Sequence, residues 1–215
     1  MHASEIMNTT GIFGSNVKMS GSSEIIQSHI EALDSGIVEI GNSVLIGCGI
    51  VAFDGASVRI ADGCNMKGLM VICKGAGSRV EIGHHCNVHA DFWGKTVIHC
   101  KCSHLIEIGD DCLFSGNIVI RNNDGHPVYD RRYLDGKSDT PVVYNPPMDV
   151  HIGNHVWIGE GARILKGVRL GTNTIVGTGA IVTRSSSKDA VGGNVVLGGN
   201  PAKVVGNLDG YSWIE

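Results

Sequence analysis

His126 stands where a regular six-residue repeat stops, and it is the strongest candidate for chemistry in this sequence. Counting on in sixes from Ile108, Phe114 and Ile120 leads to position 126, where an imidazole replaces the expected apolar side chain. An imidazole with a pKa of about 6.5 can take a proton from a hydroxyl group at neutral pH. The sequence therefore predicts a general base at His126, with a polar cap at the end of the core as the alternative.

His126 belongs to a long excursion, residues 124–150, that contains several prolines and charged side chains. A long excursion from a rigid scaffold is usually functional, so we expect a surface arm. Asn123 and Asp124 would orient the imidazole or contact a substrate, and their alternative role is to form a turn. Arg131 and Arg132 lie on the arm, where acidic residues balance the basic ones, so charge alone does not demand an anionic substrate.

The repeat must position these side chains. From Ile152 to Val182 an aliphatic residue begins each group of six, Gly follows it in four of the five groups, and a small residue often takes the fifth place. A period of six does not match the helical period of about 3.6, whereas it fits a short strand followed by a turn. We expect the first and fifth places to point inward, and Gly or Asn to accept the unusual backbone angles of the turns. Three such segments close a triangular coil of about 18 residues, and stacked coils form an all-β solenoid whose hand the periodicity does not determine.

The repeat defines one main domain, residues 36–206. Aliphatic positions recur from Ile40 to Ile120 at spacings longer than one regular coil, which indicates insertions at the corners. Before residue 36 the pattern is too weak to assign. We therefore expect an irregular N-terminal segment at 1–35, with early coils as the alternative, and a C-terminal tail at 207–215.

Composition argues against several classes of protein. The chain has 215 residues, a net charge of −4 and a pI of about 6.2, so the chain as a whole does not bind nucleic acid by charge. No apolar run of about 18 residues predicts a membrane span, and the N-terminus lacks the charged start and apolar core of a secretion signal. Most of the seven cysteines occupy small, buried places of the repeat, so we expect free thiols and a cytoplasmic protein.

One part of the chain departs from this acidic balance. Between residues 159 and 205, six basic residues stand against two acidic ones, Glu160 and Asp189. A local positive field suits a ligand with phosphate groups, and scattered solubilising charge is the alternative. The basic residues are Arg163, Lys166, Arg169, Arg184, Lys188 and Lys203.

Several stretches in a fixed order resemble the left-handed β-helix O-acetyltransferases of the hexapeptide-repeat family. They are the repeat itself, DGHP, NHVWIGEGARILKGV, VGTGAIVTR and GGNPAKVV, and the resemblance covers about residues 36–206. The stretch IRNNDGHPVYD is most similar to capsule polysaccharide O-acetyltransferases, including the polysialic acid type. The resemblance implies a left-handed helix, acetyl-CoA as donor, a carbohydrate acceptor, no metal, and a homotrimer with active sites between subunits.

The resemblance also implies roles for individual residues. His126 matches the catalytic base of the family, and Trp157 matches a tryptophan beside the donor thioester or the acceptor. The backbone N–H of Glu160 would hold the oxyanion while the acceptor alkoxide attacks the thioester directly. Arg131 and Arg132 would contact an anionic acceptor such as sialic acid. Coenzyme A would lie along the later coils, against Trp157, Gly159, Glu160, Lys166, Gly177, Thr178, Thr183, Arg184 and Lys203.

Three other functions stay open. The first is N-acetylation of an amino or nucleotide sugar. The second is a γ-class zinc carbonic anhydrase, which shares the solenoid; the pairs His84/His89 and His99/His104 favour it, although a matching histidine upstream is lacking. The third is a non-catalytic scaffold, which would not need the His-Pro break, the tryptophan and the basic tract together. Asp91 stands where the galactoside enzymes have a sugar-contacting Asn, so that role is not transferred.

Overall fold

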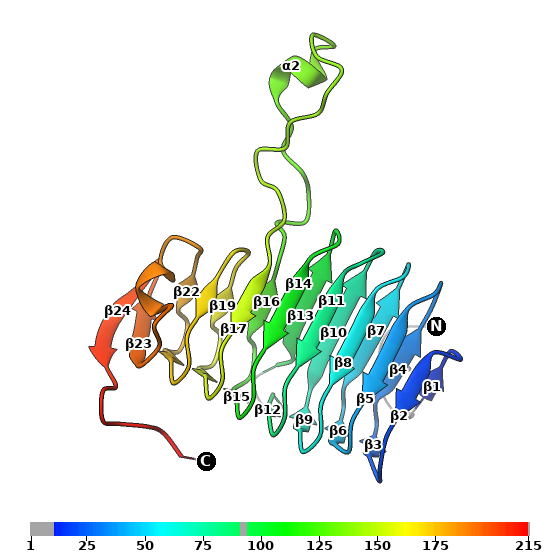
Figure 1. Ribbon diagram of the computed structural model, residues 1–215, viewed down its shortest axis with the longest axis vertical. Helices are drawn as coiled ribbons and strands as arrows, with labels where there is room; N and C mark the ends of the chain where they lie inside the picture. Colours follow the sequence, from blue (N-terminus) through cyan, green and yellow to red (C-terminus); the bar gives the residue numbers. More distant parts are fainter. Residues whose placement is uncertain (1–10, 91–93, 215) are drawn as a thin grey trace.

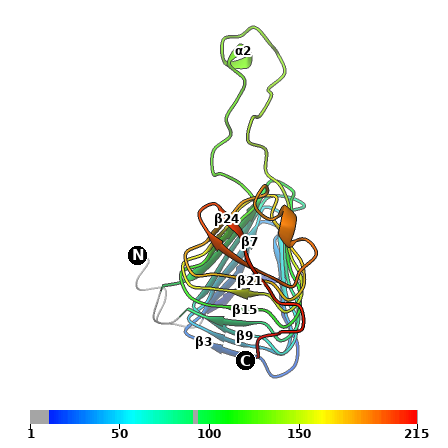
Figure 2. The same ribbon diagram turned by 90° about the vertical axis from the view of Figure 1, so that its left-hand side faces the viewer.

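The computed structural model describes residues 11–90 and 94–214, which form a triangular solenoid of stacked parallel strands (Figures 1 and 2). Each coil contributes one strand to each of three sheets, so the chain climbs along the solenoid axis as it turns.

The strands of the three sheets have the following bounds. The eight-stranded sheet contains β1 (Gly11–Phe13), β4 (His29–Ala32), β7 (Gly49–Phe53), β10 (Leu69–Lys74), β13 (Thr96–Lys101), β16 (Val119–Arg121), β19 (Arg163–Ile164) and β22 (Ile181–Val182). The seven-stranded sheet contains β2 (Val17–Met19), β5 (Ile37–Ile40), β8 (Ser57–Ile60), β11 (Arg79–Ile82), β14 (Leu105–Ile108), β17 (Val150–Ile152) and β20 (Arg169–Leu170). The nine-stranded sheet contains β3 (Glu24–Ile26), β6 (Val44–Ile46), β9 (Asn65–Lys67), β12 (Asn87–His89), β15 (Leu113–Phe114), β18 (Trp157–Ile158), β21 (Ile175–Val176), β23 (Val195–Gly199) and β24 (Ala202–Asn207).

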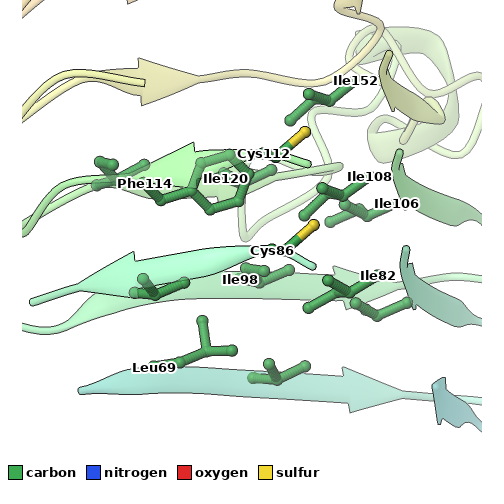
Figure 3. Close-up of a cluster of buried hydrophobic side chains, with 14 of the residues drawn as sticks. Leu69, Ile82, Cys86, Ile98, Ile106, Ile108, Cys112, Phe114, Ile120 and Ile152 are labelled. Atoms are coloured by element: carbon green, nitrogen blue, oxygen red, sulfur yellow. The ribbon is translucent and has the colours of Figure 1, made fainter. Parts of the chain in front are cut away.

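The predicted inward positions of the repeat form the core. The first places from Ile152 to Val182 are buried, and so are the fifth places, Val156, Ala162, Val168, Thr174 and Ala180. Equivalent residues of neighbouring coils stack in columns, as Ile82, Ile108 and Ile152 do in Figure 3. Phe114 is the largest fully buried side chain among the described residues, and its truncation to Ala would cost about 3–5 kcal/mol of stability.

Glycines in and beside the turns have two different roles. We expected them to accept unusual backbone angles, but those that follow the aliphatic residue have another role. Positive φ angles fall on the fourth place of each group of six: His155, Gly161, Gly167, Asn173 and Gly179, with φ between 54° and 76°. In the regular groups the glycine after the aliphatic residue does not adopt positive φ. A Cβ on Gly159, for example, would lie 2.8 Å from the backbone nitrogen of Thr178. These second-place glycines therefore allow coils to stack closely, and the fourth place makes the turn.

The coils begin earlier than the sequence pattern indicates. β1 pairs with β4 and β2 pairs with β5, so the parallel stacking starts at Gly11 rather than near residue 36. The outer coils carry exposed apolar side chains, for instance Ile12 and Met19, at places where the next coil is buried, at Ile30 and Ile40. This partial exposure blurs the apolar period and explains why the pattern was too weak to assign.

Two segments depart from the coils. An arm leaves the solenoid after β16 and returns before β17; it carries α2 (Arg131–Leu134) at its far end (Figures 1 and 2). The backbone N–H of Met148 donates to Asn122 O and closes the neck, so the arm spans 123–147 rather than 124–150. At the other end η1 (Lys188–Ala190) precedes β23, and β24 runs antiparallel to β23 before the chain continues as a tail.

The cysteines are free, and their burial follows the expectation. Six of them are buried, whereas Cys102 is exposed in a turn with a φ of 66°. Cys64, Cys86 and Cys112 occupy the same place in successive coils, and Figure 3 shows Cys86 and Cys112 in this core column. Within the ranges described, no helix has the length and apolar character needed to cross a membrane.

Candidate active site

His126 lies at the root of the arm, at the edge where the eight-stranded and seven-stranded sheets meet. Its side chain is exposed, and its backbone carbonyl accepts a hydrogen bond from Asn145 Nδ2 at 2.9 Å. An apolar recess of about 320 Å³ opens beside it, lined by Pro127, Tyr129 and Val143 among others. The candidate base is thus open to a substrate while the backbone that carries it is fixed.

The residues just before His126 do not orient its ring. Asn123 is buried; its amide donates to Asn122 Oδ1 at 2.8 Å, and its own Oδ1 accepts the N–H of Gly125 at 2.9 Å. Asn123 therefore forms the turn that starts the arm, and it is one of the residues that line the recess beside His126. The expected contact of Asn123 with a substrate stays a prediction.

Asp124 is engaged by a basic residue from a later coil. Lys166 Nζ donates to Asp124 Oδ2 at 2.5 Å, and Asn145 Nδ2 donates to the same oxygen at 3.1 Å. Partial burial alone would raise the pKa of the Asp124 carboxyl, but the hydrogen bonds from Lys166 and Asn145 hold this pKa below its ordinary value. The pair ties the arm root to the coil at 163–168. Lys166, expected to contact coenzyme A, is therefore occupied within the chain.

Trp157 lies on a different face from His126. Its indole points outward from β18 with 37% of the residue exposed. Leu113, Trp157, Ile175 and Val196 occupy one register position on adjacent strands of the nine-stranded sheet, so an apolar column surrounds the indole. A single chain does not bring His126 and Trp157 together, because they stand at separate edges of the triangle.

Four of the expected cofactor residues follow the strand of Trp157. Gly159 and Glu160 come after β18, and Gly177 and Thr178 occupy the same turn one coil later, where Gly179 N donates to Glu160 O at 2.8 Å. The N–H of Glu160 has no acceptor within residues 11–90 and 94–214. It is therefore available to hold a developing negative charge, as the resemblance implies.

The remaining expected cofactor residues lie elsewhere. Thr183 and Arg184 follow β22 at the edge from which the arm leaves, and Arg184 Nη1 lies 3.8 Å from Met148 Sδ. Lys203 is exposed on β24, opposite Gly198 of β23. The expected cofactor set therefore divides between two edges and the antiparallel end of the solenoid.

Fewer basic side chains between residues 159 and 205 are available to a ligand than the sequence count indicates. Arg163 Nη1 donates to the carbonyl oxygens of Asn117, Gly161 and Ala162, and Lys166 pairs with Asp124. In the described chain the exposed basic residues of this tract that form no ion pair are Arg169, Arg184, Lys188 and Lys203. These side chains are free to meet the phosphates of a ligand such as coenzyme A.

The arm tip carries the two expected acceptor arginines. Arg132 forms a two-point ion pair with Asp130, through Nε at 3.2 Å and Nη2 at 3.1 Å, and Asp130 also caps α2. Side-chain hydrogen bonds from Arg132 lower the pKa of the Asp130 carboxyl below its ordinary value. Arg131 is exposed, so of the two arginines it is the less constrained.

The histidines of the zinc alternative have other partners. His104 Nδ1 lies 2.8 Å from Asp149 Oδ1, and the centroid of the His84 ring lies 6.0 Å from that of His85. No group of three His, Cys, Asp or Glu side chains in the described part of the chain could hold a metal ion. Asp91, the residue at the place of a sugar-contacting Asn, lies outside the described residues.

A larger hollow, about 480 Å³, lies over the seven-stranded sheet. Its lining includes Glu81, Glu107 and His151, and His151 Nδ1 is 2.8 Å from Glu107 Oε2. None of the expected site residues lines it. It is a groove lined by charged side chains of the seven-stranded sheet, away from His126 and Trp157.

Two groups of contacts at the candidate site do not follow from the sequence pattern. Asn145 fixes the arm root through Asp124 and the His126 carbonyl, and no local pattern signals it because 19 residues separate it from His126. Trp213, in the C-terminal tail, has its ring centroid 6.5 Å from that of Trp157. The residue type, a tryptophan close to a second aromatic residue, Tyr211, is the one signal that the sequence of the tail offers.

Comparison with known families identifies the repeat. Residues 149–184 match the family described as bacterial transferase hexapeptide (six repeats). The chain carries the hexapeptide-repeat β-helix of the bacterial transferases. This stretch contains Trp157, Gly159, Glu160 and Lys166, so the expected cofactor residues of the middle coils lie inside the matched repeat.

Curated relatives of this hexapeptide-repeat protein are acetyltransferases. It is 34% identical over 148 residues to the polysialic acid O-acetyltransferase of Escherichia coli O1:K1, which covers 69% of this chain and 42% of that relative. It is 32% identical over 133 residues to the galactoside O-acetyltransferase of Escherichia coli K12, covering 62% of this chain and 56% of that relative. The chain thus spans about half the length of these curated relatives, and the expected resemblance to O-acetyltransferases is confirmed.

Solved structures share the architecture. The polySia specific acetyltransferase NeuO superposes with a TM-score of 0.67 at 20% identity, covering 96% of this chain and 84% of that one. The polysialic acid O-acetyltransferase OatWY superposes with a TM-score of 0.57 at 25% identity, covering 95% and 92%. The predicted fold class, a left-handed parallel β-helix, is confirmed.

Proposed function

We propose that this hexapeptide-repeat protein is an acetyl-CoA-dependent O-acetyltransferase that acts on a hydroxyl group of a sugar. The observation that carries the proposal is His126: an exposed imidazole at the point where the β-helix opens into an arm, beside an apolar recess. The similarity to O-acetyltransferases of polysialic acid and galactosides supports the same reaction class.

In the proposed reaction His126 takes the proton from the acceptor hydroxyl. The hydroxyl oxygen attacks the acetyl carbonyl carbon, and the N–H of Glu160 stabilises the oxyanion; the loss of one such donor typically costs about 3 kcal/mol. The carbon–sulfur bond then breaks, and the thiolate leaves with the proton that the imidazole carries. No covalent enzyme intermediate and no metal are needed for this sequence.

Coenzyme A fits the residues available to it. The column at Leu113, Trp157 and Ile175 suits an apolar arm that ends in a thioester. The exposed cations Arg184, Lys188 and Lys203 suit phosphate groups. When bound, acetyl-CoA supplies the acetyl group and a good leaving group; Lys166 would take part only after release from Asp124.

We further propose a homotrimer in which His126 of one chain meets Trp157 of its neighbour. Supporting this, the two residues stand at separate edges of one chain, and the arm projects away from its own solenoid (Figure 2). A cyclic arrangement brings unlike edges of adjacent chains together. Six buried free thiols further favour a cytoplasmic location.

Complementation between variants tests the shared site. His126→Ala and Trp157→Ala are purified separately, then unfolded, mixed and refolded together. If each site combines residues from two chains, the mixture regains activity in about a quarter of its sites, because random assembly leaves these sites intact. A mixture as inactive as its parts, or an active monomer by light scattering, would contradict the trimer.

The acceptor proposed is an anionic capsular polysaccharide, with sialic acid as the favoured sugar. Support comes from the relatives named for polysialic acid and from the arginines at the arm tip. The decisive experiment is a thiol-release assay with acetyl-CoA across sialic acid oligomers, neutral oligosaccharides and amino sugars. Release with a hydroxyl acceptor supports the function; release with amino sugars alone would make the chain an N-acetyltransferase, and none at all would overturn the proposal.

A further inference from the structure

The C-terminal tail, residues 208–214, does not trail away from the solenoid but follows the edge where the seven-stranded and nine-stranded sheets meet. Leu208 N donates to Asn194 O at 2.7 Å, and Tyr211 N donates to Leu208 O at 2.8 Å. The tail therefore leaves β24 in a fixed direction and runs back over the turns that precede β21 and β18.

Turn residues of three successive coils hold the tail in place. Asn173 Nδ2 donates to Asn194 Oδ1 at 2.9 Å and to the Tyr211 carbonyl at 3.0 Å. Ser212 Oγ lies 2.8 Å from His155 Nε2 and donates to Asn173 Oδ1 at 3.4 Å. His155, Asn173 and Asn194 all have positive φ near 55°, so the same turn geometry presents each side chain to the tail.

The C-terminal tail places one aromatic ring beside the candidate site. The Trp213 indole stacks on the His155 imidazole with a centroid distance of 4.0 Å and an interplanar angle of 2°. Its centroid lies 6.5 Å from that of Trp157, with the rings tilted by 56°. Tilted aromatic pairs at this separation attract one another, so each ring restricts the orientation of its neighbour.

Packing, rather than a hydrogen bond from the indole, accounts for the position of the Trp213 side chain. Its Nε1 is shielded from solvent and has no acceptor in the described part of the chain. A phenyl ring at this place would therefore lose no hydrogen bond and would keep an aromatic face against Trp157.

We propose that Trp213 in the C-terminal tail, held by His155, acts as a positioning residue that fixes the indole of Trp157 at the acetyl-transfer site. The inference rests on the proposed function. Trp157 stands on a strand of two residues and is exposed on its outer side, so its own backbone does little to restrict its side chain. A wall that orients a thioester or a sugar must not rotate, since small misplacements lower turnover steeply.

Three single variants test the role by thiol release, with melting temperature as the fold control. Trp213→Ala should lower kcat/KM roughly 10- to 100-fold, the loss expected when a reacting group is misplaced. Trp213→Phe should keep most of the activity. Tyr211→Ala is the matched control, because its side chain is 75% exposed and only its backbone carbonyl binds Asn173, so activity should not change.

A double variant separates positioning from general destabilisation. If Trp213 acts through Trp157, then Trp157→Ala/Trp213→Ala should be no less active than Trp157→Ala alone, because the second loss has nothing left to position. Multiplied losses would overturn the proposal. If the parent protein transfers acetyl groups and Trp213→Ala is equally active, the proposal is also overturned.

An optical measurement tests the ring pair without any turnover. Two indoles this close couple their transitions, so the circular dichroism of the parent minus that of Trp213→Phe should contain an exciton couplet. Its absence would overturn the pair and with it the inference. A parent that shows the couplet yet transfers acetyl to no acceptor would instead overturn the proposed function, and the positioning role would fall with it.

Discussion

The same hexapeptide coils support two edges of opposite character. At the arm edge the repeat is interrupted, and polar contacts dominate: Asp124 binds Lys166, and Asn145 binds both Asp124 and the His126 carbonyl. At the tail edge the repeat runs on, hydrogen bonds from Asn173 hold the tail, and aromatic rings make the contacts that reach the candidate site, where Trp213 lies against His155 and Trp157.

The difference shows where a solenoid can vary. The first and fifth places of the repeat are buried in the coils beneath both edges, so these places cannot distinguish the edges. The second place must stay small where coils stack, as at Gly159. What differs is the outward places, the turn residues and the chain inserted between coils, and these carry every candidate functional side chain.

The largest expected effect tests the arm edge. His126→Ala should lower turnover by about 10²- to 10⁴-fold, the usual share of a general base. The melting temperature should barely change, because the side chain is exposed. His84→Ala, an exposed histidine on a distant coil, is the control and should remain active. Near-normal turnover in His126→Ala would show that His126 is not the general base and that the arm edge takes no part in the proton transfer.

The next effect tests the tail edge. Trp157→Ala should lower kcat/KM roughly 10- to 100-fold, because the thioester or acceptor loses a wall of its site. The fold should survive, since the indole lies outside the core. Ile175→Ala, on the same outward column, leaves the indole in place and should cost less activity. Aggregation of Trp157→Ala would mean that the aromatic edge is structural and that only the arm edge is chemical.

A smaller effect concerns the arm tip. Arg131→Ala/Arg132→Ala should raise KM for a sialic acid oligomer by about 3- to 10-fold, as expected for exposed charge pairs worth about 1 kcal/mol. KM for acetyl-CoA should stay the same, and added salt should weaken acceptor binding in the parent more than in the variant. Lys137→Ala, which removes an exposed cation paired with Asp135 on the same arm, serves as the control. Equal KM values would favour a neutral acceptor.

The smallest effect concerns the link between arm and coil. The folded-state pKa of Asp124 is below its ordinary value, so the ion pair stabilises the arm root above a pH of about 4 and this contribution disappears as the pH falls through the folded-state pKa. Because Asp124 is partly exposed, the contribution should be below about 1 kcal/mol. Proteolysis of the arm should therefore become faster in acid in the parent, whereas Asp124→Asn should be cleaved at a rate that changes less with pH.

The sequence predicts the inward half of this molecule well. The apolar places from Ile152 to Val182 depend on a local rule, that a strand alternates faces and a turn follows, and the structure obeys it. The general place of the arm and the outward position of Trp157 follow from the same count. The role of the second-place glycines could not be predicted in this way, because a stacking contact such as that of Gly159 against Thr178 joins residues of different coils.

The contacts that the sequence could not predict are those between distant segments. The sequence gives no sign that Lys166 has an ion-pair partner, because the fold alone brings it to Asp124, 42 residues earlier. Likewise 58 residues separate His155 from the Trp213 carbonyl that lies beside it. Residue type and spacing carry no signal for such pairs unless the register of every intervening coil is known.

The cysteine column has a consequence for following the opening of this fold. A hydrogen bond with Cys112, together with burial, raises the pKa of the Cys86 thiol to about 12, so alkylating reagents should ignore it while the coil is closed. The six buried cysteines lie two to a coil on three successive coils, Cys48 and Cys64, then Cys73 and Cys86, then Cys100 and Cys112, and exposed Cys102 can serve as an internal reference. Because each coil of a solenoid depends chiefly on its neighbours, it opens in steps along its length. The order in which these thiols become labelled would thus show the order in which the coils that precede the arm unfold.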